Sequence, residues 1–543
     1  MSHKVVILGG GVAGLSAAQE LAERGIRVEV YERLGEFGGK ARSIDVPDSA
    51  TGNRLPLPGE HGFRFFPSFY RNIFDTLKRI PYGKNRQGVY DNLRATSHVM
   101  AARDGDEPVI LPLNLPEGIA DLEALYRLFI RNDVNIPREE MRVFMDRIFV
   151  FLTSCQERRN QEFDLLPWWD FIQAEGKSEE YIAFLAVGLT RDLVAMQAEI
   201  SSTRTVASIY VQLLLGMAKP WEDVNRILNG PTTEVWIDPW VSYLTQLGVT
   251  FHPYARVEEI EFAYGKVQGV KINLDGQEWI AQGDDYIFAL PVEVMAELMS
   301  DEIATAAPSL SQLKELQTGW MIGLQYFFDR DVAINKGHIL YVDSPWALTS
   351  IFEHQYWDHI DLSKYGKGDV KGFLSICISD WNTPGTLIPK PARECTPEEI
   401  QSEVWHQLTS RLTGPQRAML EEANIIEWFL SPTVHIPTDG SPSRNDEPLL
   451  LNTVGSLTKR PLATTQVSNL YLASDYVRTD TDLATMESAN EAARRAVNGI
   501  LARLPAHYFP ARVYSLQEPA IFEPLKAYDR LRFQRGLPHH RMS

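Results

Sequence analysis

The chain opens with short apolar runs that flank a helical pattern. Residues 4–8 read KVVIL, a continuous β-branched and apolar run of the kind that is buried in a parallel sheet. Residues 13–24 are good helix formers with apolar side chains at helical spacing, and residues 28–31, VEVY, predict a second strand. This order of strand, helix and strand predicts an α/β unit of the Rossmann type.

Later segments repeat the two periodicities. Residues 248–260 and 267–274 flank a turn at Tyr264 and Gly265, which predicts a β-hairpin. Residues 470–473 predict a strand, and residues 483–501 predict the helix that follows it. Apolar stripes at helical spacing recur through residues 117–217, in the runs 122–130, 141–152 and 206–218. These helices could cover a substrate as a lid, although such stripes more often belong to a core.

Residues 59–72, GEHGFRFFPSFYRN, are the densest aromatic stretch. From Ser68 onward the spacing predicts a helix whose apolar face packs inward. The preceding residues 59–66 predict a loop that combines His61 and Arg64 with Phe65 and Phe66. For His61, a buried structural imidazole and a catalytic role are both open.

Glycines at fixed spacing join the first strand to the first helix. Gly9 allows a tight turn, Gly11 lets the backbone approach a pyrophosphate, and Gly14 lets the helix pack closely on the strand. Glu32 ends the second strand, where a carboxylate can accept hydrogen bonds from ribose hydroxyls, as in sites for NAD or FAD. The binding residues predicted in this segment are Gly9, Gly11, Val12, Ala13, Gly14 and Glu32.

Composition and charge narrow the class of protein. The length of 543 residues indicates two to four domains, and 44% hydrophobic with 23% charged residues is typical of a globular chain. A net charge of −18 argues against a nucleic-acid partner, which requires clustered basic residues. The three cysteines are far apart and His354 and His359 do not share a helix face, so we expect no disulfide framework and no metal site.

Targeting signals are sparse. The chain passes from MSHK directly into the first apolar run, which leaves no room for a signal peptide. No uninterrupted apolar run approaches the roughly 18 residues that span a bilayer. We therefore expect a cytoplasmic protein, with peripheral membrane contact left open for the basic tail around His539 and His540, which we expect to be solvated.

A second glycine motif points to one cofactor. Residues 32–42, ERLGEFGGKAR, resemble the segment in which paired glycines of FAD enzymes approach the cofactor. Together with residues 59–72, 227–247, 320–332 and 470–501, it resembles the FAD-dependent phytoene desaturase and flavin amine oxidase superfamily. Within it, the chain looks like the desaturase branch, which contains phytoene desaturase, zeta-carotene desaturase and hydroxysqualene dehydroxylase.

The resemblance implies an α/β fold with a Rossmann-type FAD-binding domain assembled from discontinuous segments, an inserted α+β substrate-binding domain and a helical lid. The expected division is FAD-binding residues 1–100, 231–295 and 451–505, a helical substrate-binding insertion at 101–230, a substrate-binding domain at 296–450 and a C-terminal tail at 506–543. Further cofactor contacts are implied for Arg33, Gly38, Gly39, Lys40, Arg42, Gly59, Val257, Asp475 and Met486.

The implied activity is dehydrogenation of a hydrophobic, isoprenoid or carotenoid-like substrate by hydride transfer to flavin N5. His61 and Arg64 are the candidate catalytic residues, Phe65 and Phe66 the candidate substrate contacts, and a quinone and oxygen are both open as electron acceptors. A flavin amine or amino-acid oxidase and a non-redox flavin-dependent isomerase are the alternatives.

Two departures from the family pattern bear on the substrate. Gly323 stands where amine oxidases commonly have a lysine, which weakens the amine oxidase alternative. Residues 210–214 lack the arginine of plant-type phytoene desaturases, so phytoene itself is in doubt as the substrate.

Overall fold

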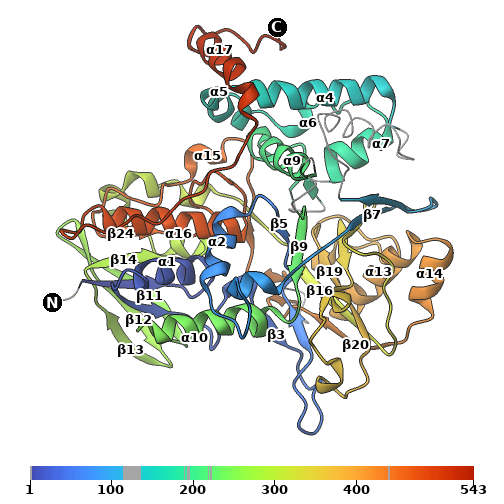
Figure 1. Cartoon of the computed structure of the whole chain (residues 1–543), viewed down its shortest axis with the longest axis horizontal. Helices are drawn as coiled ribbons and strands as arrows, with labels where there is room; N and C mark the ends of the chain where they lie inside the picture. Colours follow the sequence, from blue (N-terminus) through green and yellow to red (C-terminus); the bar gives the residue numbers. More distant parts are fainter. Residues whose placement is uncertain are drawn as a thin grey trace.

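The computed structural model describes residues 3–113, 136–188, 190–191, 196–217, 219, 223–437 and 441–542. A five-stranded parallel sheet lies in one half of the molecule (Figure 1). Its order is β10 (Thr250–His252), β2 (Arg27–Tyr31), β1 (Lys4–Leu8), β14 (Asp285–Phe288) and β24 (Leu470–Leu472). Strands from the start, middle and end of the chain thus pair side by side, so the predicted Rossmann unit is assembled from separated segments.

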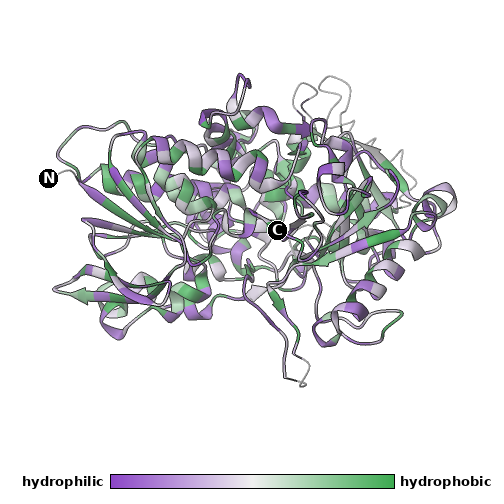
Figure 2. Ribbon diagram, turned by 90° about the horizontal axis from the view of Figure 1, so that it is seen from below, coloured by the Kyte–Doolittle hydropathy of each residue, from purple (hydrophilic) through white to green (hydrophobic). Residues whose placement is uncertain are grey.

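Helices and a small antiparallel sheet flank this parallel sheet (Figures 1 and 2). Helix α1 (Val12–Ala22) packs against α16 (Met486–Leu501), and both bury alanine-rich faces. The antiparallel sheet consists of β11 (Ala255–Ala263), β12 (Lys266–Leu274) and β13 (Gln277–Ala281). The predicted hairpin is β11 and β12, but residues 250–252 belong to the parallel sheet, and β13 was not anticipated from the sequence.

A seven-stranded sheet forms the second half of the molecule. Its order is β20 (Ile425–Leu430), β16 (Ile322–Phe328), β19 (Gly372–Ile378), β18 (Leu348–Ile351), β17 (Ile339–Tyr341), β7 (His98–Ala102) and β8 (Val109–Pro112). Helices α13 (Pro397–Ser410) and α14 (Gly414–Glu421) lie beside it (Figure 1). Because β7 pairs with β17, residues 98–112 join the sheet of residues 296–450, which differs from the expected division at residue 101.

Helices form a third part above the two sheets (Figure 1). They include α4 (Arg138–Thr153), α5 (Gln156–Gln161), α6 (Trp168–Phe171) and α9 (Thr203–Met217). The helical run expected at 122–130 lies outside the described residues. In the part of the chain that is described, no helix is long and apolar enough to cross a membrane.

The C-terminal segment corrects one expectation. Helix α17 (Glu523–Gln534) packs against α4 and α5, and His539 is buried. The tail is therefore docked on the helical part through Asp529 and His539, whereas its basic side chains at Arg530, Arg535 and Arg541 are exposed, as expected.

The aromatic stretch at 59–72 divides differently from the prediction. Phe66 and Pro67 form the short strand β5, which pairs with β9 (Asn225–Leu228), and helix α2 (Arg71–Arg79) begins at Arg71 rather than Ser68. The amide of Ser68 donates to the carbonyl of Val224, so the chain is held extended there and the helix starts later.

Candidate functional site

One cavity of about 1180 Å³ runs from the glycine-rich loop to the seven-stranded sheet. Residues from all three parts of the Rossmann unit line it, together with residues 61–70 and side chains of α9. The residues predicted as site residues that line it are Gly9, Gly11, Val12, Ala13, Glu32, Arg33, Gly38, Gly39, Lys40, His61, Arg64, Phe65, Val257, Asp475 and Met486. The tertiary structure thus gathers into one cavity residues that are up to 477 positions apart.

The first glycine loop has the geometry that a bound pyrophosphate requires. Gly9 has a φ of +104°, and a Cβ on it would lie 2.4 Å from the carbonyl oxygen of Ala289. A Cβ on Gly14 would lie 1.9 Å from the oxygen of Gly9, so only glycine permits this helix to pack so closely on the loop. At Gly11, by contrast, an added Cβ meets no atom within 3.5 Å, and the backbone there faces the cavity at the start of α1.

The second glycine pair completes a cradle around the loop. Gly38 has a φ of +106° and forms a bridge with Gly11, and a Cβ on Gly39 would lie 3.0 Å from the Cα of Gly11. Two backbone segments therefore meet at the cavity without side chains between them. This arrangement leaves room for a cofactor against the main chain, as the sequence pattern predicts.

Glu32 is fixed beside the first loop. Its Oε2 accepts a hydrogen bond from the amide of Gly10 at 2.7 Å, and its Oε1 accepts one from the amide of Leu34 at 3.0 Å. Burial raises the pKa of Glu32, although these two hydrogen bonds oppose the effect. The carboxylate is held at the cavity wall with lone pairs left for a ribose.

Four predicted site residues do not line the cavity. Gly14 acts through the packing described above, and Gly59 lies in β4 (Pro58–Glu60), where a Cβ would lie 2.5 Å from the ring of Phe429. Phe66 is fully buried against Trp236, with ring centroids 5.6 Å apart, and is a core residue instead of a part of the substrate wall. The predicted positions therefore include residues that shape the core behind the site.

Arg42 is the fourth of these residues, and the structure assigns it a different role. Its guanidinium donates to Glu447 at 2.8 Å and to Glu36 at 2.9 Å, and its side chain is buried. Arg42 is thus an ion-pair partner behind the cavity wall, while Glu447 itself lines the cavity.

Glu447 is a site residue that the sequence analysis missed. Its Oε2 is buried, has no hydrogen-bond partner among the described residues and lies 3.9 Å from Nδ1 of His61. Burial alone would raise the pKa of Glu447, but the charges of Arg42 and Lys40 hold it below its ordinary value. No local pattern around residue 447 indicates this role, because its partners lie some 400 positions away.

His61 is enclosed at the cavity. Burial lowers the pKa of His61 to about 3, with Glu447 opposing the shift and the nearby cation of Arg64 adding to it. Its Nδ1 lies 3.3 Å from the hydroxyl of Ser431. The imidazole is therefore neutral at physiological pH and suited to hydrogen bonding rather than to supplying charge.

Arg64 is anchored to the backbone of the second glycine segment. Its Nη2 donates to the carbonyl of Lys40 at 2.7 Å, and it lies 3.4 Å from the carboxylate of Glu60. Glu60 is fully buried and in turn helps to raise the pKa of the buried Glu353 to about 8, after the larger effect of burial. Arg64 thus links the cavity to a buried polar cluster beneath the seven-stranded sheet.

Apolar and aromatic side chains form much of the wall of the same cavity. Phe63, which the sequence analysis did not single out, lies in it with Phe65, and both rings contact the buried ring of His338. Other apolar and aromatic residues that line this cavity include Phe69, Tyr70, Ile209, Leu213, Met321 and Leu483. Such a lining removes water from whatever group is held there.

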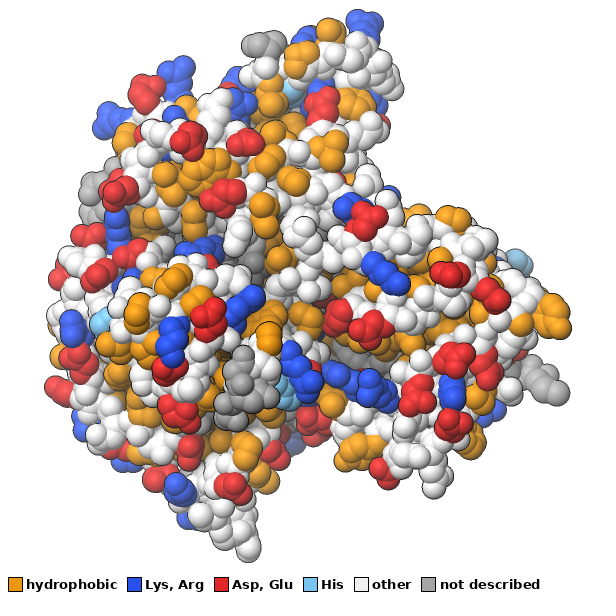
Figure 3. Space-filling view, turned by 180° about the vertical axis from the view of Figure 1, so that it is seen from behind, with side chains coloured by type: hydrophobic (Ala, Val, Ile, Leu, Met, Phe, Trp, Pro, Cys, Tyr) orange, Lys and Arg blue, Asp and Glu red, His pale blue; other side chains and the backbone are white. Residues whose placement is uncertain are grey.

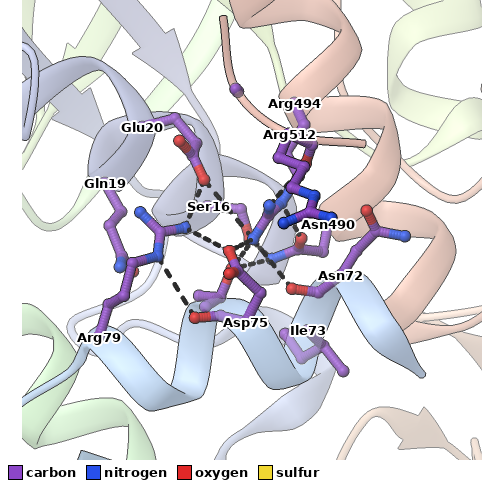
Figure 4. A network of polar contacts seen from close by, with 12 residues as sticks. Ser16, Gln19, Glu20, Asn72, Ile73, Asp75, Arg79, Asn490, Arg494 and Arg512 are labelled. Atoms are coloured by element: carbon purple, nitrogen blue, oxygen red, sulfur yellow. Dashed lines mark hydrogen bonds and ion pairs between the residues drawn. The ribbon is translucent and has the colours of Figure 1, made fainter. Parts of the chain in front are cut away.

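A buried polar network holds the cofactor-binding segments together (Figure 4). Arg494 of α16 donates to Asn490 at 2.8 Å, to Asp75 of α2 at 2.8 Å and to the carbonyl of Arg512 at 2.7 Å. Asn490 donates to Ser16 of α1 at 2.7 Å. The network therefore ties α1, α2 and α16, whose first residues face the cavity or lie beside it.

Comparisons with known proteins identify a flavoprotein family, in agreement with the cofactor cavity described above. The family described as flavin containing amine oxidoreductase matches residues 12–501. The chain is 22% identical over 510 residues to a 15-cis-phytoene desaturase of Synechococcus elongatus, covering 92% of this chain and 96% of the relative. It is also 22% identical over 528 residues to a zeta-carotene desaturase of Synechocystis, covering 92% and 97%.

Solved structures share the fold. A putrescine oxidase bound to putrescine aligns with a TM-score of 0.60 at 13% identity over 93% of this chain and all of that one. An oxidoreductase from Methanosarcina mazei aligns with a TM-score of 0.58 at 15% identity over 92% of this chain and all of that one.

Proposed function

The chain belongs to the flavin-containing amine oxidoreductase family, and from this premise we propose that it dehydrogenates a hydrophobic, isoprenoid or carotenoid-like substrate. It is an FAD-dependent oxidoreductase, and relatives that match over nine-tenths of the chain are carotenoid desaturases. The observation that carries the proposal is the aromatic and apolar lining of the cavity that also holds a neutral His61.

The residues that would hold FAD follow from the cavity. The backbone of Gly11 and the N-terminus of α1 are suited to the pyrophosphate, Glu32 to the ribose, and Asp475 and Met486 lie at the same cavity near the N-terminus of α16. When bound, FAD supplies the acceptor of a hydride from substrate carbon.

The protein's own residues exclude water and orient the substrate. The rings of Phe63, Phe65 and Phe69 offer an apolar surface, and Ile209 and Leu213 of α9 extend it. An isoprenoid gains affinity from burial of its hydrocarbon surface at roughly 25 cal/mol per Å². At the polar end of this wall, His61 and Arg64 would position the hydrocarbon chain of the substrate and the proton that the substrate loses.

The geometry at Gly323 disfavours amine oxidation. A Cβ on Gly323 would lie 2.5 Å from the carbonyl oxygen of Glu60 and 2.6 Å from the backbone of His61. The backbone of residues 60–61 thus occupies the space that a side chain from this strand would need. A lysine cannot project from this position without displacing the wall.

Anaerobic reduction of the holoenzyme tests the proposal. Isoprenoid and carotenoid substrates should bleach the oxidised flavin, whereas a panel of amines and amino acids should leave it oxidised and yield no peroxide in air. Bleaching by an amine would favour an oxidase. Turnover by pre-reduced enzyme without an acceptor would instead favour a non-redox isomerase.

A quinone and oxygen remain our two proposed electron acceptors, and re-oxidation of reduced enzyme by each distinguishes them. We also propose a cytoplasmic location, with peripheral membrane contact as a route to hydrophobic substrates.

A further inference from the structure

A second cavity of about 1280 Å³ lies next to the cofactor cavity. Phe69 lines both cavities. Helix α9 presents Ile209 and Leu213 to the cofactor cavity and Ser208 and Gln212 to the second one. The remaining walls include residues of α2, α5, β9, α16 and α17, the residues after β24 and residues 515–519, which lead to α17. Only one helix and one aromatic ring therefore separate the two spaces at this point.

The charge of the second cavity is opposite to that of the chain. Eight basic and three acidic side chains line it, whereas the whole chain carries 53 basic and 71 acidic residues. Elsewhere, as on the face in Figure 3, acidic and basic side chains are interspersed. The basic lining is thus a local feature of a chain whose net charge is negative. Such a local excess of basic side chains is what the electrostatic attraction of an anion requires.

Several of these basic side chains are already neutralised. Arg159 pairs with Glu518 at 2.6 Å, and Arg495 lies 3.2 Å from Asp480. Arg204 pairs with the buried Asp482. These ion pairs form part of the wall, so the capacity for a ligand must come from other residues.

Arg71 and Arg478 keep their charge available. Arg71 donates to the carbonyl of Ser515 at 3.3 Å and lies over the ring of Tyr514. Arg478 donates to the carbonyls of Thr458, at 2.9 Å, and Arg460. Within the described part of the chain, neither guanidinium has a carboxylate within 4.0 Å.

Cations and carboxylates both surround Arg478. Burial lowers the pKa of Arg478 and the neighbouring cations Arg460 and Arg204 lower it further, while the more distant carboxylates of Asp482 and Asp164 oppose the shift. Backbone contacts hold both guanidinium groups in place, so little side-chain entropy remains to be lost when an anion binds. A planar guanidinium offers parallel N–H donors to phosphate oxygens.

We propose that the second cavity is a binding site for a phosphate or diphosphate group, with Arg71 and Arg478 as its principal cationic contacts. The group could be a free anion or the head of an amphiphile whose apolar tail passes Phe69 toward the cofactor cavity. The site is distinct from the proposed dehydrogenation and does not depend on it.

Calorimetric titration of the FAD-loaded protein with inorganic pyrophosphate at low salt tests the site. We expect saturable binding of one pyrophosphate, weakened about tenfold by Arg71→Gln and by Arg478→Gln. Arg417→Gln, which removes an exposed arginine of α14, is the matched control and should leave the affinity unchanged. An absence of saturable binding, or equal affinity in Arg71→Gln and the control, would overturn the proposal.

Folding is checked separately, because Arg478 also holds two backbone carbonyls. Flavin content and melting temperature report the integrity of each variant. Where Arg478→Gln does not fold, Arg478→Lys and Arg71→Gln decide the question, since lysine keeps the charge without the bidentate geometry. The readout is binding, so the result stands whether or not any isoprenoid is oxidised.

A second titration identifies the source of the group. Farnesyl diphosphate that binds at least tenfold more tightly than pyrophosphate and perturbs the flavin spectrum would identify an amphiphile spanning both cavities. Equal affinities with an unchanged flavin spectrum would identify a free anion site.

Discussion

At the scale of single residues, Glu32 connects backbone geometry to cofactor binding. Its carboxylate holds the amides of Gly10 and Leu34 and remains at the cavity wall. Glu32→Ala removes both loop contacts and the ribose acceptor, so we expect the Kd for FAD to rise about tenfold or more. Titration of the apoprotein with FAD measures the change.

Glu36→Ala is the control for Glu32, because Glu36 lies in the same segment but is exposed and pairs only with Arg42 among the described residues. Equal FAD affinity in the two variants would contradict the role of Glu32.

Substitution of His61 separates its proposed role in turnover from a role in cofactor binding. His61 is enclosed beside Ser431 and Glu447, and we expect His61→Ala to retain FAD and lower turnover about 10- to 100-fold. Turnover at the wild-type level would assign His61 to structure alone.

The same residue predicts a pH dependence of stability. Because the pKa of His61 is about 3 when folded and near 6.5 when unfolded, the unfolded chain binds the proton more tightly between these values. The contribution of the neutral, buried His61 to the free energy of unfolding is thus fully present above pH 6.5. It is lost progressively as the pH falls from 6.5 toward 3. Turnover should show no titration of His61 near pH 6.5, and His61→Gln should melt with a weaker acid dependence than the wild type.

At the scale of elements, helix α2 depends on a distant helix. Glu487 of α16 accepts hydrogen bonds from the amides of Asn72 and Ile73, each at 2.8 Å, and so caps the N-terminus of α2. Burial raises the pKa of Glu487 to about 7. The sequence pattern at residues 68–80 cannot indicate a capping residue that lies 415 positions away. For this reason the predicted helix start, at Ser68, was three residues too early.

Arg494 provides the corresponding test. It is fully buried and contacts α2 and residue Arg512, so Arg494→Ala would leave Asp75 and Asn490 without a main partner. We expect a loss of about 3 kcal/mol in stability, seen as a lower melting temperature and weaker FAD retention.

Arg417→Ala is the exposed control. Arg417 of α14 pairs with Glu421 at the surface, and both side chains are exposed, so its removal should cost less than about 1 kcal/mol. Similar melting temperatures for the two variants would show that the network in Figure 4 does not hold the segments together.

At the scale of the whole molecule, the docked C-terminus closes the chain against its helical part. Asp529 of α17 accepts from Arg158 at 3.0 Å and from the amide of Cys155 at 2.9 Å, and the Asp529 and Arg158 side chains are fully buried. Asp529→Ala would leave the buried charge of Arg158 without its buried carboxylate, which should lower the free energy of unfolding by about 3 kcal/mol. We expect limited proteolysis to remove the C-terminal segment from this variant while FAD stays bound.

Asp146→Ala tests an exposed contact of the same interface, because Asp146 pairs with Arg541 at the surface. It should retain the wild-type cleavage pattern. Resistance of Asp529→Ala to protease would show that other contacts are sufficient to dock α17.

The sequence by itself determined the parts of this protein that depend on local periodicity and on backbone conformation. The strand, glycine loop, helix and Glu32 follow one another within about 30 residues, and Gly9 and Gly14 must be glycine for reasons of φ and contact that any such unit shares. The cofactor and the family could therefore be predicted from short motifs.

Only the tertiary structure decided which side chains face the cavity. Arg42 pairs with Glu447, Phe66 packs on Trp236, and the tail docks through Asp529, all by contacts between residues far apart in the chain. The second, basic cavity likewise combines α2, α9 and the chain after β24. The local sequence pattern indicates whether a side chain is buried. The partner of that side chain, however, depends on how distant segments meet, and the partner determines whether the residue belongs to the core, to an ion pair or to the site.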